Sequence, residues 1–477
     1  MGKDILIDVN PYRTIVASIE SDKVVEVRLE RSEEMSLVGN IYRGVVKNVL
    51  PGMSVAFVDI GAERNALLHF HDVLMPHGEK RIEHYIRVGN EILVQVVKEP
   101  LDAKGAKLDM KVSLPGHCIV LLPMEKGIYF SKRITDNDFK SHIRELLGPT
   151  LPEGIGAIVR SEAVSATDEE LIREQRVLID RWKNIQTVFN GSRNVKLLWQ
   201  EDKLYARAIR DLFRSDTERV FVNDYSCYKE IVNLCNAENI GNIDRIQFTS
   251  DGENLIERFN VSKQIDTALS RRVWLKSGAY IVFDSTEALV SIDVNTGKNV
   301  GSSDFSTTAF KTNAEAAIEI ARQLRLRNLG GIIIIDFIDM DSTEDRDALI
   351  KLLRQEMAND PMHPRVFGMT QLGLVEVARR RIGSSLQTIF TEECSFCGGR
   401  GRLATATTIA LKIRQRIMDE IRYGNEDFTV TARPEILGAA KKILATDRAE
   451  QRIAESIAIS FKNDVFMNPE HFEVKVR

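Results

Sequence analysis

Two short apolar segments, separated by a segment of helical length, form the clearest pattern in the chain. Residues 288–299 read ALVSIDVNTGKN and residues 330–340 read GGIIIIDFIDM, and each pattern predicts a strand. Between them, residues 307–328 carry apolar side chains at spacings of three and four, which predicts a helix. A strand, a crossover helix and a strand make the two strands parallel neighbours. The three segments therefore predict a βαβ unit.

Polar residues stand at the ends of both predicted strands. Asp293 and Asn295 end the first strand, and Asp336 lies near the end of the second. The carboxyl ends of parallel strands meet at one edge of a sheet, where such sheets hold their sites. Carboxylates with oxygen-rich neighbours suit Mg²⁺, which also uses substrate phosphate oxygens. The pattern thus predicts metal-assisted phosphodiester chemistry. The competing interpretation is that each Asp only caps a turn.

Asp339 is an alternative to Asp336 as the second carboxylate, because it follows three residues later in the FIDM string. Strand alternation sends positions 336 and 339 to opposite faces. We therefore expect only one of the two to face the metal.

The rest of the chain alternates between β-rich and mixed regions. Five short strands between Gly and Pro turns predict a small closed barrel of the oligonucleotide-binding (OB) type, although any small β-barrel fits the pattern equally well. After the βαβ unit we expect a second helix, a strand and a basic helix. By range, the pattern gives paired strands at 1–35, the barrel at 38–115, strands with a long helix at 119–204, an α/β region at 205–270, the basic helix LVEVARRRI at 374–382 and a small α/β tail at 402–477.

Composition limits the class of protein. A length of 477 residues suggests roughly three or four domains. The net charge of −4 argues against a uniformly basic nucleic-acid binder, but local clusters can still bind phosphate. Five Cys do not make a disulfide framework. The N-terminus lacks an apolar signal core and no apolar run is long enough for a membrane span. These features predict a soluble cytoplasmic protein without a membrane anchor.

A C-x-x-C pair, Cys394 and Cys397, precedes Gly398 and Gly399. This spacing suits a zinc knuckle, but a structural zinc wants four ligands and no other Cys or His is near in the sequence. The pair is half a site, which two copies of the chain would complete. A redox pair and a plain tight turn are the alternatives, although the redox motif belongs between a strand and a helix.

Several cations and one aromatic residue are candidate RNA contacts. A charge cluster is more often a solvated face than a phosphate site, and a strand aromatic is more often core than a stacking platform. The candidates are Phe57, Lys104 and Lys107 in the barrel, Lys132, Arg133, Arg160 and Ser161 after strands of the next region, and Arg379, Arg380 and Arg381 on the predicted basic helix.

Four segments resemble the ribonuclease E/G family of bacterial endoribonucleases. They are VAFVDIGAERNALL (55–68), DSTEALVSIDVNTG (284–297), ARQLRLRNLGGIIIIDFIDM (321–340) and CSFCGGRG (394–401). The resemblance covers residues 1–401 in order and the remainder weakly. No long disordered scaffold follows the last domain, which favours the shorter members of the family.

The resemblance implies an α/β multidomain architecture. In chain order it comprises a ribonuclease-H-like domain built from 1–35 and 205–270, an inserted OB-type barrel at 36–118, a sensor of the RNA 5′ phosphate at 119–204, a deoxyribonuclease-I-like catalytic domain at 271–390, a zinc link at 391–401 and a small dimerisation domain at 402–477.

The resemblance also implies roles for residues at the catalytic and metal sites. Asp293 and Asp336 would hold Mg²⁺, and Asn295 would orient groups at the site. Cys394 and Cys397 would supply half of a zinc site shared between two chains. This gives a homodimer and leaves open whether dimers pair into tetramers.

Further implied roles concern RNA binding. Phe57 matches a barrel aromatic that stacks on RNA, while its usual aromatic companion is Leu67 here. Arg160 matches the sensor arginine, and Ser161 replaces the family threonine but keeps the hydroxyl. The sensor loop near Gly127 and Ile128 aligns poorly.

The implied function is Mg²⁺-dependent hydrolysis of single-stranded RNA in rRNA maturation and mRNA decay. Attack by an activated water would leave a 5′ phosphate and a 3′ hydroxyl. The sensor would favour 5′-monophosphorylated ends, and rRNA precursors would be among the partners. The alternative function is a non-catalytic RNA-binding assembly protein. A small-molecule phosphatase is a weaker alternative, because the barrel argues against it.

Overall fold

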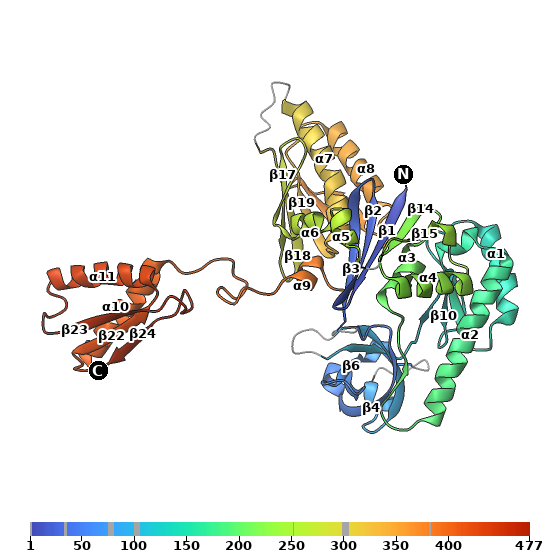
Figure 1. Ribbon diagram of the computed structural model, residues 1–477, viewed down its shortest axis with the longest axis horizontal. Coiled ribbons are helices and arrows are strands. Elements are labelled where there is room, and N and C mark those ends of the chain that lie inside the picture. The colour runs from blue at the N-terminus through green and yellow to red at the C-terminus, as the bar shows by residue number, and fades with distance from the viewer. Residues whose placement is uncertain are drawn as a thin grey trace. The chain divides into compact units, whose positions relative to one another are not determined.

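The computed structural model describes residues 2–32, 36–74, 81–99, 105–250, 252–297, 305–380 and 383–477, with the backbone alone at 305–307. The chain divides into two compact units, residues 1–389 and 390–477, whose elements are labelled in Figure 1.

The N-terminal strands and a later segment build one sheet in the first unit. β1 pairs in parallel with β14 and antiparallel with β2, and the strand order is β15-β14-β1-β2-β3. The apolar side chains of β1 and β14 pack against helices α3 and α4. The elements are β1 (Lys3–Asn10), β2 (Arg13–Glu20), β3 (Lys23–Arg31), α3 (Leu204–Leu212), β14 (Thr217–Val222), α4 (Tyr225–Glu238), β15 (Ile246–Phe248), α5 (Leu255–Arg258) and α6 (Val261–Leu269).

The predicted barrel is confirmed. Its longest strand, β4, pairs with β5 on one side and β7 on the other, which closes the sheet on itself. One strand that the sequence pattern did not predict, β13, joins β4 from much later in the chain. The strands are β4 (Ile41–Leu50), β5 (Val55–Asp59), β6 (Ala66–His69), β7 (Glu91–Lys98), β8 (Lys107–Asp109) and β13 (Lys196–Trp199).

A four-stranded sheet of order β11-β12-β10-β9 follows the barrel and packs on the long helix α2. Thr167 and Glu170 form a reciprocal capping box that fixes where α2 begins. The elements are β9 (Leu114–Pro115), β10 (Ile119–Leu122), β11 (Gly127–Phe130), α1 (Asn137–Leu147), β12 (Gly156–Val159) and α2 (Asp168–Gly191).

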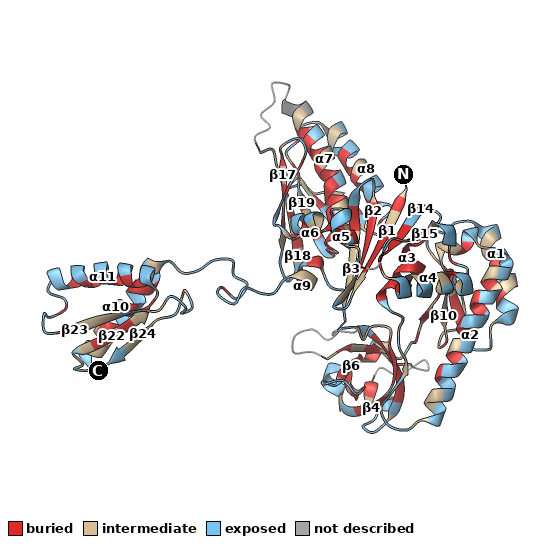
Figure 2. Cartoon of the chain, in the orientation of Figure 1, coloured by how far each residue is buried: buried red, intermediate tan, exposed pale blue. Residues whose placement is uncertain are grey.

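The predicted βαβ unit is confirmed inside a six-stranded sheet of order β16-β17-β18-β19-β21-β20. β18 and β19 are parallel neighbours, and α7 connects them. Alternate residues of the strands, among them Ile292 and Ile333, are buried with the inner sides of α7 and α8 (red in Figure 2). The elements are β16 (Arg272–Trp274), β17 (Tyr280–Ser285), β18 (Leu289–Asn295), α7 (Phe305–Leu326), β19 (Gly331–Asp336), α8 (Thr343–Met357), β20 (Arg365–Met369), β21 (Leu374–Arg379) and α9 (Leu386–Phe390).

The predicted basic helix at 374–382 is wrong, because residues 374–379 form strand β21. Val375 and Val377 are buried while Glu376 is exposed, so the true period is two. Arg379 is buried and donates to Asp360 at 2.7 Å and to the carbonyl of Leu329 at 2.6 Å. Arg379 is therefore a structural cation rather than a phosphate contact. Arg381 lies outside the described residues.

Helix α7 also contacts the N-terminal sheet of β1–β3, β14 and β15. Arg322 on α7 donates to the carbonyl of Val24 on β3 at 2.7 Å, and Lys23 lies 3.5 Å from Glu319. The sheet that carries Asp293 is thus anchored to the N-terminal sheet through its crossover helix.

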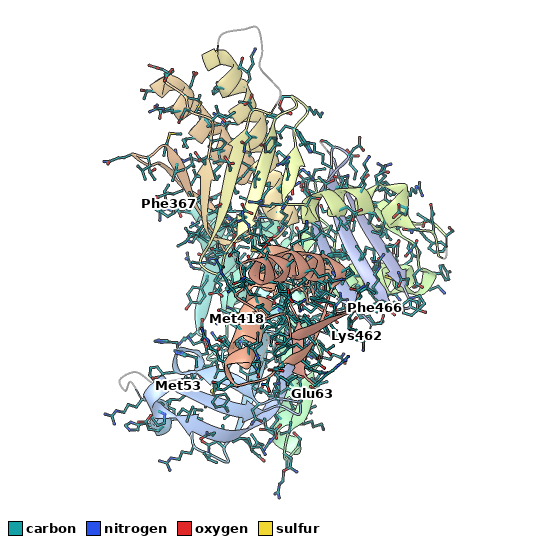
Figure 3. All side chains as sticks on the ribbon, turned by 90° about the vertical axis from the view of Figure 1, so that its left-hand side faces the viewer. Met53, Glu63, Phe367, Met418, Lys462 and Phe466 are labelled. Carbon is teal, nitrogen blue, oxygen red and sulfur yellow. The ribbon has the colours of Figure 1, made fainter. Side chains whose placement is uncertain are left out.

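The second unit begins with the Gly-rich segment and continues into a small α/β domain. Its three-stranded sheet has the order β23-β22-β24, with β22 and β23 parallel. Phe466 lies after β23 and is 93% exposed (Figure 3). The elements are α10 (Ala406–Arg422), β22 (Asp427–Ala432), α11 (Pro434–Ala449), β23 (Ala458–Asn463) and β24 (Glu473–Val476).

None of the helices that the structure describes is both long enough and apolar enough to span a bilayer.

Candidate active site

Asp293 and Asp336 meet at one edge of the six-stranded sheet. They are direct partners in the register of β18 and β19, and both are exposed. Residues paired across neighbouring strands project from the same face. Asn295 lies two residues beyond Asp293 on that face, and its Nδ2 donates to Asp293 Oδ2 at 2.7 Å. The backbone register therefore brings together the three residues that the sequence singled out here.

The charged groups that act on Asp336 at this edge are other carboxylates. The pKa of Asp336 is raised, first by partial burial and then by the negative charges of Asp293 and Asp339. Asp339 is thus close enough to act on Asp336, although it lies in the loop after β19. A site that concentrates carboxylate charge in this way fits a divalent cation.

Asn313 on α7 fixes the loop after Asp336, and the sequence pattern gave it no role. Its side chain is fully buried, donates to the carbonyl of Ile338 at 2.7 Å and accepts from the amide of Ile338 at 3.0 Å. A polar residue inside the apolar stripe of the crossover helix was the available signal.

The donor set suits Mg²⁺. The described residues contain no cluster of three or more His, Cys, Asp or Glu that could enclose a metal on their own. Two carboxylates and an amide oxygen are hard donors, and Mg²⁺ commonly binds through one or two carboxylates while phosphate oxygens and waters complete its shell. The residues present therefore fit this ion in the presence of a phosphate ligand.

A row of side chains crosses the outer face of the barrel. Phe57 on β5 is the register partner of Leu67 on β6, and Leu67 is the partner of Lys107 on β8. All three are half-buried, and Lys107 Nζ lies 2.8 Å from Asp72 Oδ2. Lys104 lies outside the described residues. The barrel thus lines up one aromatic, one aliphatic and one cationic side chain, of which the cation is already paired.

Arg160 and Ser161 follow β12 and are engaged with carboxylates. Arg160 donates to Asp211 Oδ1 at 3.0 Å and to the carbonyl of Gly116 at 2.9 Å, and Ser161 Oγ donates to Glu162 at 3.1 Å. Burial disfavours the charge of Asp211, but Arg28 and Arg160 hold its pKa below the usual value. A phosphate at Arg160 must therefore compete with Asp211.

Strand β11, which begins at Gly127, lies beside β12. Gly127 and Ile128 pair in parallel with Gly156 and Ala157. Gly127 and Ile128, where a sensor loop was expected, are therefore part of a strand, and this strand lies next to the one that leads to Arg160.

Cations from two distant segments, and the carboxylate of Asp360, act on the pKa of His363. The pKa of His363 is lowered, first by burial and then by the positive charge of Arg133, with Arg380 and Lys132 acting in the same direction. Lys132 and Arg133 follow β11, whereas His363 and Arg380 belong to the segment of β20 and β21. The sequence could not reveal this cluster, because the two segments are far apart in the chain.

Cys394 and Cys397 lie in one turn. The amide of Gly398 donates to the carbonyl of Cys394 at 2.8 Å, and the amide of Gly401 lies 3.3 Å from the sulfur of Cys397. Gly398 has a φ of +54°, in the left-handed region that favours glycine. Backbone amides of Cys397 and Phe396 lower the pKa of the exposed Cys394 thiol. Amide donors around thiolates fit zinc, and the turn offers two ligands.

Comparison with known proteins gives matches over nearly the whole chain. Residues 113–382 match the model of the Ribonuclease E/G family, and residues 37–111 match that of the S1 RNA binding domain. The chain is 35% identical to Ribonuclease G of Haemophilus influenzae and 34% identical to Ribonuclease G of Escherichia coli K12, with 99% of each chain covered. It is 36% identical to Ribonuclease E of Nostoc sp. PCC 7120 over 81% of this chain and 57% of that protein.

Proposed function

Because the chain belongs to the ribonuclease E/G family, we propose that it is an Mg²⁺-dependent endoribonuclease that hydrolyses single-stranded RNA. Its nearly full-length likeness to Ribonuclease G supports an enzyme of this type. The observation that carries the proposal is the direct pairing of Asp293 with Asp336, with Asn295 bonded to the first carboxylate.

The chain's own residues have distinct roles in the proposed reaction. Asp293 and Asp336 would hold Mg²⁺, and the amide of Asn295 would fix the orientation of the Asp293 carboxylate. The ion would neutralise charge on the scissile phosphate and lower the pKa of a water. Hydrolysis would leave a 5′ phosphate and a 3′ hydroxyl. Asn313 would keep the loop after Asp336 in place through Ile338.

The barrel would bind the RNA strand with little sequence preference, through stacking and charge. Phe57 would stack on a base, and Lys107 would contact phosphate after exchanging its partner Asp72. Lys104 would add a second cation. Leu67 cannot stack as an aromatic residue does, so the barrel of this chain should bind RNA more weakly than one with two aromatics. The Leu67→Phe variant tests this point, because it should bind single-stranded RNA several-fold more tightly.

The RNA 5′ end would bind near Arg160 and Ser161. The cations around His363 support a phosphate-attracting surface in the region of β11 and β20. Arg160 and Ser161 already donate hydrogen bonds to the carboxylates of Asp211 and Glu162. A terminal monophosphate would bind only if it attracts these donors more strongly than the carboxylates do. The enzyme would therefore favour 5′-monophosphorylated RNA.

Membership of the ribonuclease E/G family also suggests what type of domain each sheet of this chain belongs to. The sheet of β1–β3, β14 and β15 would be the ribonuclease-H-like domain, the region of β9–β12 the sensor, and the six-stranded sheet the deoxyribonuclease-I-like catalytic domain. Cys394 and Cys397 would share a zinc ion with the same residues of a second chain and link a homodimer. The substrates would be cytoplasmic RNAs, including rRNA precursors and mRNA.

Incubation of the pure protein with single-stranded RNA, with and without Mg²⁺, tests the proposal. The RNA should carry either a 5′ monophosphate or a 5′ hydroxyl. We expect internal cleavage that requires the metal and is faster on the monophosphate. Tight RNA binding with no cleavage under any divalent cation would instead favour the non-catalytic assembly protein.

A further inference from the structure

The catalytic sheet buries one face and has exposed residues on the other. The buried face of β16–β21 forms a single core with α7 and α8. The opposite face includes Asp293, Asp336 and Ile332, all of which are exposed. Figure 1 shows α7 and α8 together on one side of these strands. A ligand bound at Asp293 and Asp336 can therefore also contact other residues on the same face of the sheet.

Three residues at one edge of this face form a group that we name the aromatic ledge: Arg272 and Trp274 on β16, and Tyr280 on β17. Trp274 and Tyr280 are register partners, and their ring centroids lie 5.2 Å apart with planes inclined by 58°. The Arg272 guanidinium carbon lies 4.4 Å from the Tyr280 ring centroid and 5.8 Å from that of Trp274. The three side chains thus hold one another in a defined arrangement.

The register places the ledge beside the carboxylate pair. Tyr280 is the direct partner of Asn295, and Arg272 lies in the same row as Val282, Asp293 and Asp336. Paired residues share a face, and neighbouring strands are about 4.8 Å apart, so Trp274 starts about 10 Å from Asn295. The ledge is therefore close enough to contact a nucleotide next to the one at the carboxylates.

Trp274 is 61% exposed. A tryptophan presents one of the largest apolar surfaces of any side chain, and its exposure beside a catalytic edge suits a planar ligand. Arg272 has no ion-pair partner among the residues that the structure describes, so its donors can meet a phosphate. A planar apolar face next to a cation that has no ion pair among the described residues matches one nucleotide of a single strand.

We infer that the aromatic ledge is a nucleotide subsite, in which Trp274 stacks on the base adjacent to the scissile phosphate and Arg272 contacts the neighbouring phosphate. The inference rests on the proposed function for the identity of the substrate. It adds a specificity-determining contact outside the carboxylate pair, the barrel and the 5′ sensor. A second copy of this chain is the other occupant that an exposed aromatic could serve, but the positive charge of Arg272 favours RNA.

An RNA series with one abasic position tests the ledge. The abasic site moves one nucleotide at a time across a mapped cleavage site. In the wild type, one abasic position next to the cleaved bond should lower kcat/KM by about ten- to a hundredfold, the usual range for one lost base–aromatic stack. Trp274→Ala should lose about the same on intact RNA and become insensitive to that abasic position. Trp274→Phe should retain most of the activity.

The matched control is Phe367→Ala on β20 of the same sheet (Figure 3). Phe367 is 52% exposed and lies under Arg365, as Trp274 lies under Arg272, but on the far edge from Asn295. This variant should leave the abasic profile unchanged. An equal loss in both alanine variants, or an unchanged abasic profile in Trp274→Ala, would overturn the subsite.

Two measurements separate this inference from other outcomes. RNA added without Mg²⁺ should quench tryptophan fluorescence in the wild type and much less in Trp274→Phe, even if the chain proves unable to cleave RNA. Sedimentation velocity should give the same oligomeric state for the wild type and Trp274→Ala. A shift of Trp274→Ala towards smaller species would assign the ledge to a subunit contact and overturn the inference.

Discussion

Asp293 lies directly opposite Asp336 across two parallel strands, although 42 residues of sequence separate them and the helix α7 fills most of that interval. The pairing is set by backbone hydrogen bonds, so neither carboxylate depends on a mobile loop for its position. Partial burial raises the pKa of Asp336, and the negative charges of Asp293 and Asp339 raise it further, as expected for like charges held side by side.

Replacement of either carboxylate should separate catalysis from binding. Asp293→Asn or Asp336→Asn should lower kcat at least about a hundredfold, because each would remove a ligand charge from the proposed metal site. RNA affinity, measured by fluorescence anisotropy, should change little, since the barrel holds the strand. Asp284→Asn is the matched control, because Asp284 lies on the same sheet but pairs with Arg271. Near-normal turnover of both variants at saturating Mg²⁺ would remove the pair from the site.

The cysteine turn makes a prediction about stoichiometry. Two ligands per chain complete a tetrahedral site only in a pair, so metal analysis should return one zinc for every two chains. Cys394→Ser with Cys397→Ser should lose the zinc and shift the protein towards monomer in sedimentation velocity. Cys235→Ser, a buried cysteine of α4, should retain both properties. One zinc per chain would rule out sharing.

The sequence could predict that Asp293 and Asp336 lie side by side because the signals for this arrangement are local. The period of three and four in α7 and the polar ends of β18 and β19 are enough to bring Asp293 and Asp336 together. The short strands between Gly and Pro turns likewise predicted the barrel. Each of these inferences needs only neighbours in the sequence and the rule for parallel crossovers.

The residues that sequence reasoning missed depend on distant partners. The sequence predicted a basic helix that includes Arg379, because three arginines follow an apolar stretch. In the structure, residues 374–379 instead form a strand that pairs antiparallel with β19. β13 joins the barrel across more than 140 residues of chain. The carboxylates at Arg160 and the cations around His363 likewise come from separate segments. No periodicity could reveal them.

The ion pair of Arg379 and Asp360 gives a stability prediction. The two side chains are only 3% and 2% exposed, so Arg379→Met leaves a buried carboxylate without its partner. Loss of one partner of a buried pair typically costs about 3–5 kcal/mol. The double variant Arg379→Met with Asp360→Leu should recover much of this in urea unfolding. Arg271→Met, at an exposed pair, should change stability little. RNA affinity should be unaffected, and a selective loss of affinity would contradict the structural role.

The RNA 5′ end provides a test in which two substrates are compared. Arg160→Ala should slow cleavage of 5′-monophosphorylated RNA by about ten- to a hundredfold, the usual cost of a lost charged hydrogen bond, and barely change the same RNA with a 5′ hydroxyl. Glu162→Gln removes the charged acceptor that competes with the RNA phosphate for the Ser161 hydroxyl. This variant should therefore increase the preference for 5′-monophosphorylated RNA. Equal losses on both RNAs, with a lower melting temperature, would show that Arg160 serves the Asp211 pair alone.

Glu174 on α2 gives a prediction for pH. Burial raises its pKa to about 7, against the opposing effect of the amides of Cys118 and Ile119, which donate to the carboxylate. A carboxyl group that binds its proton more tightly when folded makes the folded state less stable as pH rises from its unfolded pKa to its folded pKa. The free energy of unfolding should therefore fall between about pH 4.5 and pH 7 by on the order of 3 kcal/mol.

Glu174→Gln keeps an acceptor for these amides and removes the titration. Urea unfolding at pH 5 and pH 8 should show a smaller loss of stability in this variant than in the wild type. Glu169→Gln, at an exposed position on the same helix, should behave as the wild type does. If Glu174→Gln and the wild type lost equal stability between the two pH values, the amides would be holding Glu174 ionised in the folded protein. The buried end of β10 would then be stabilised by a charged carboxylate instead of a neutral one.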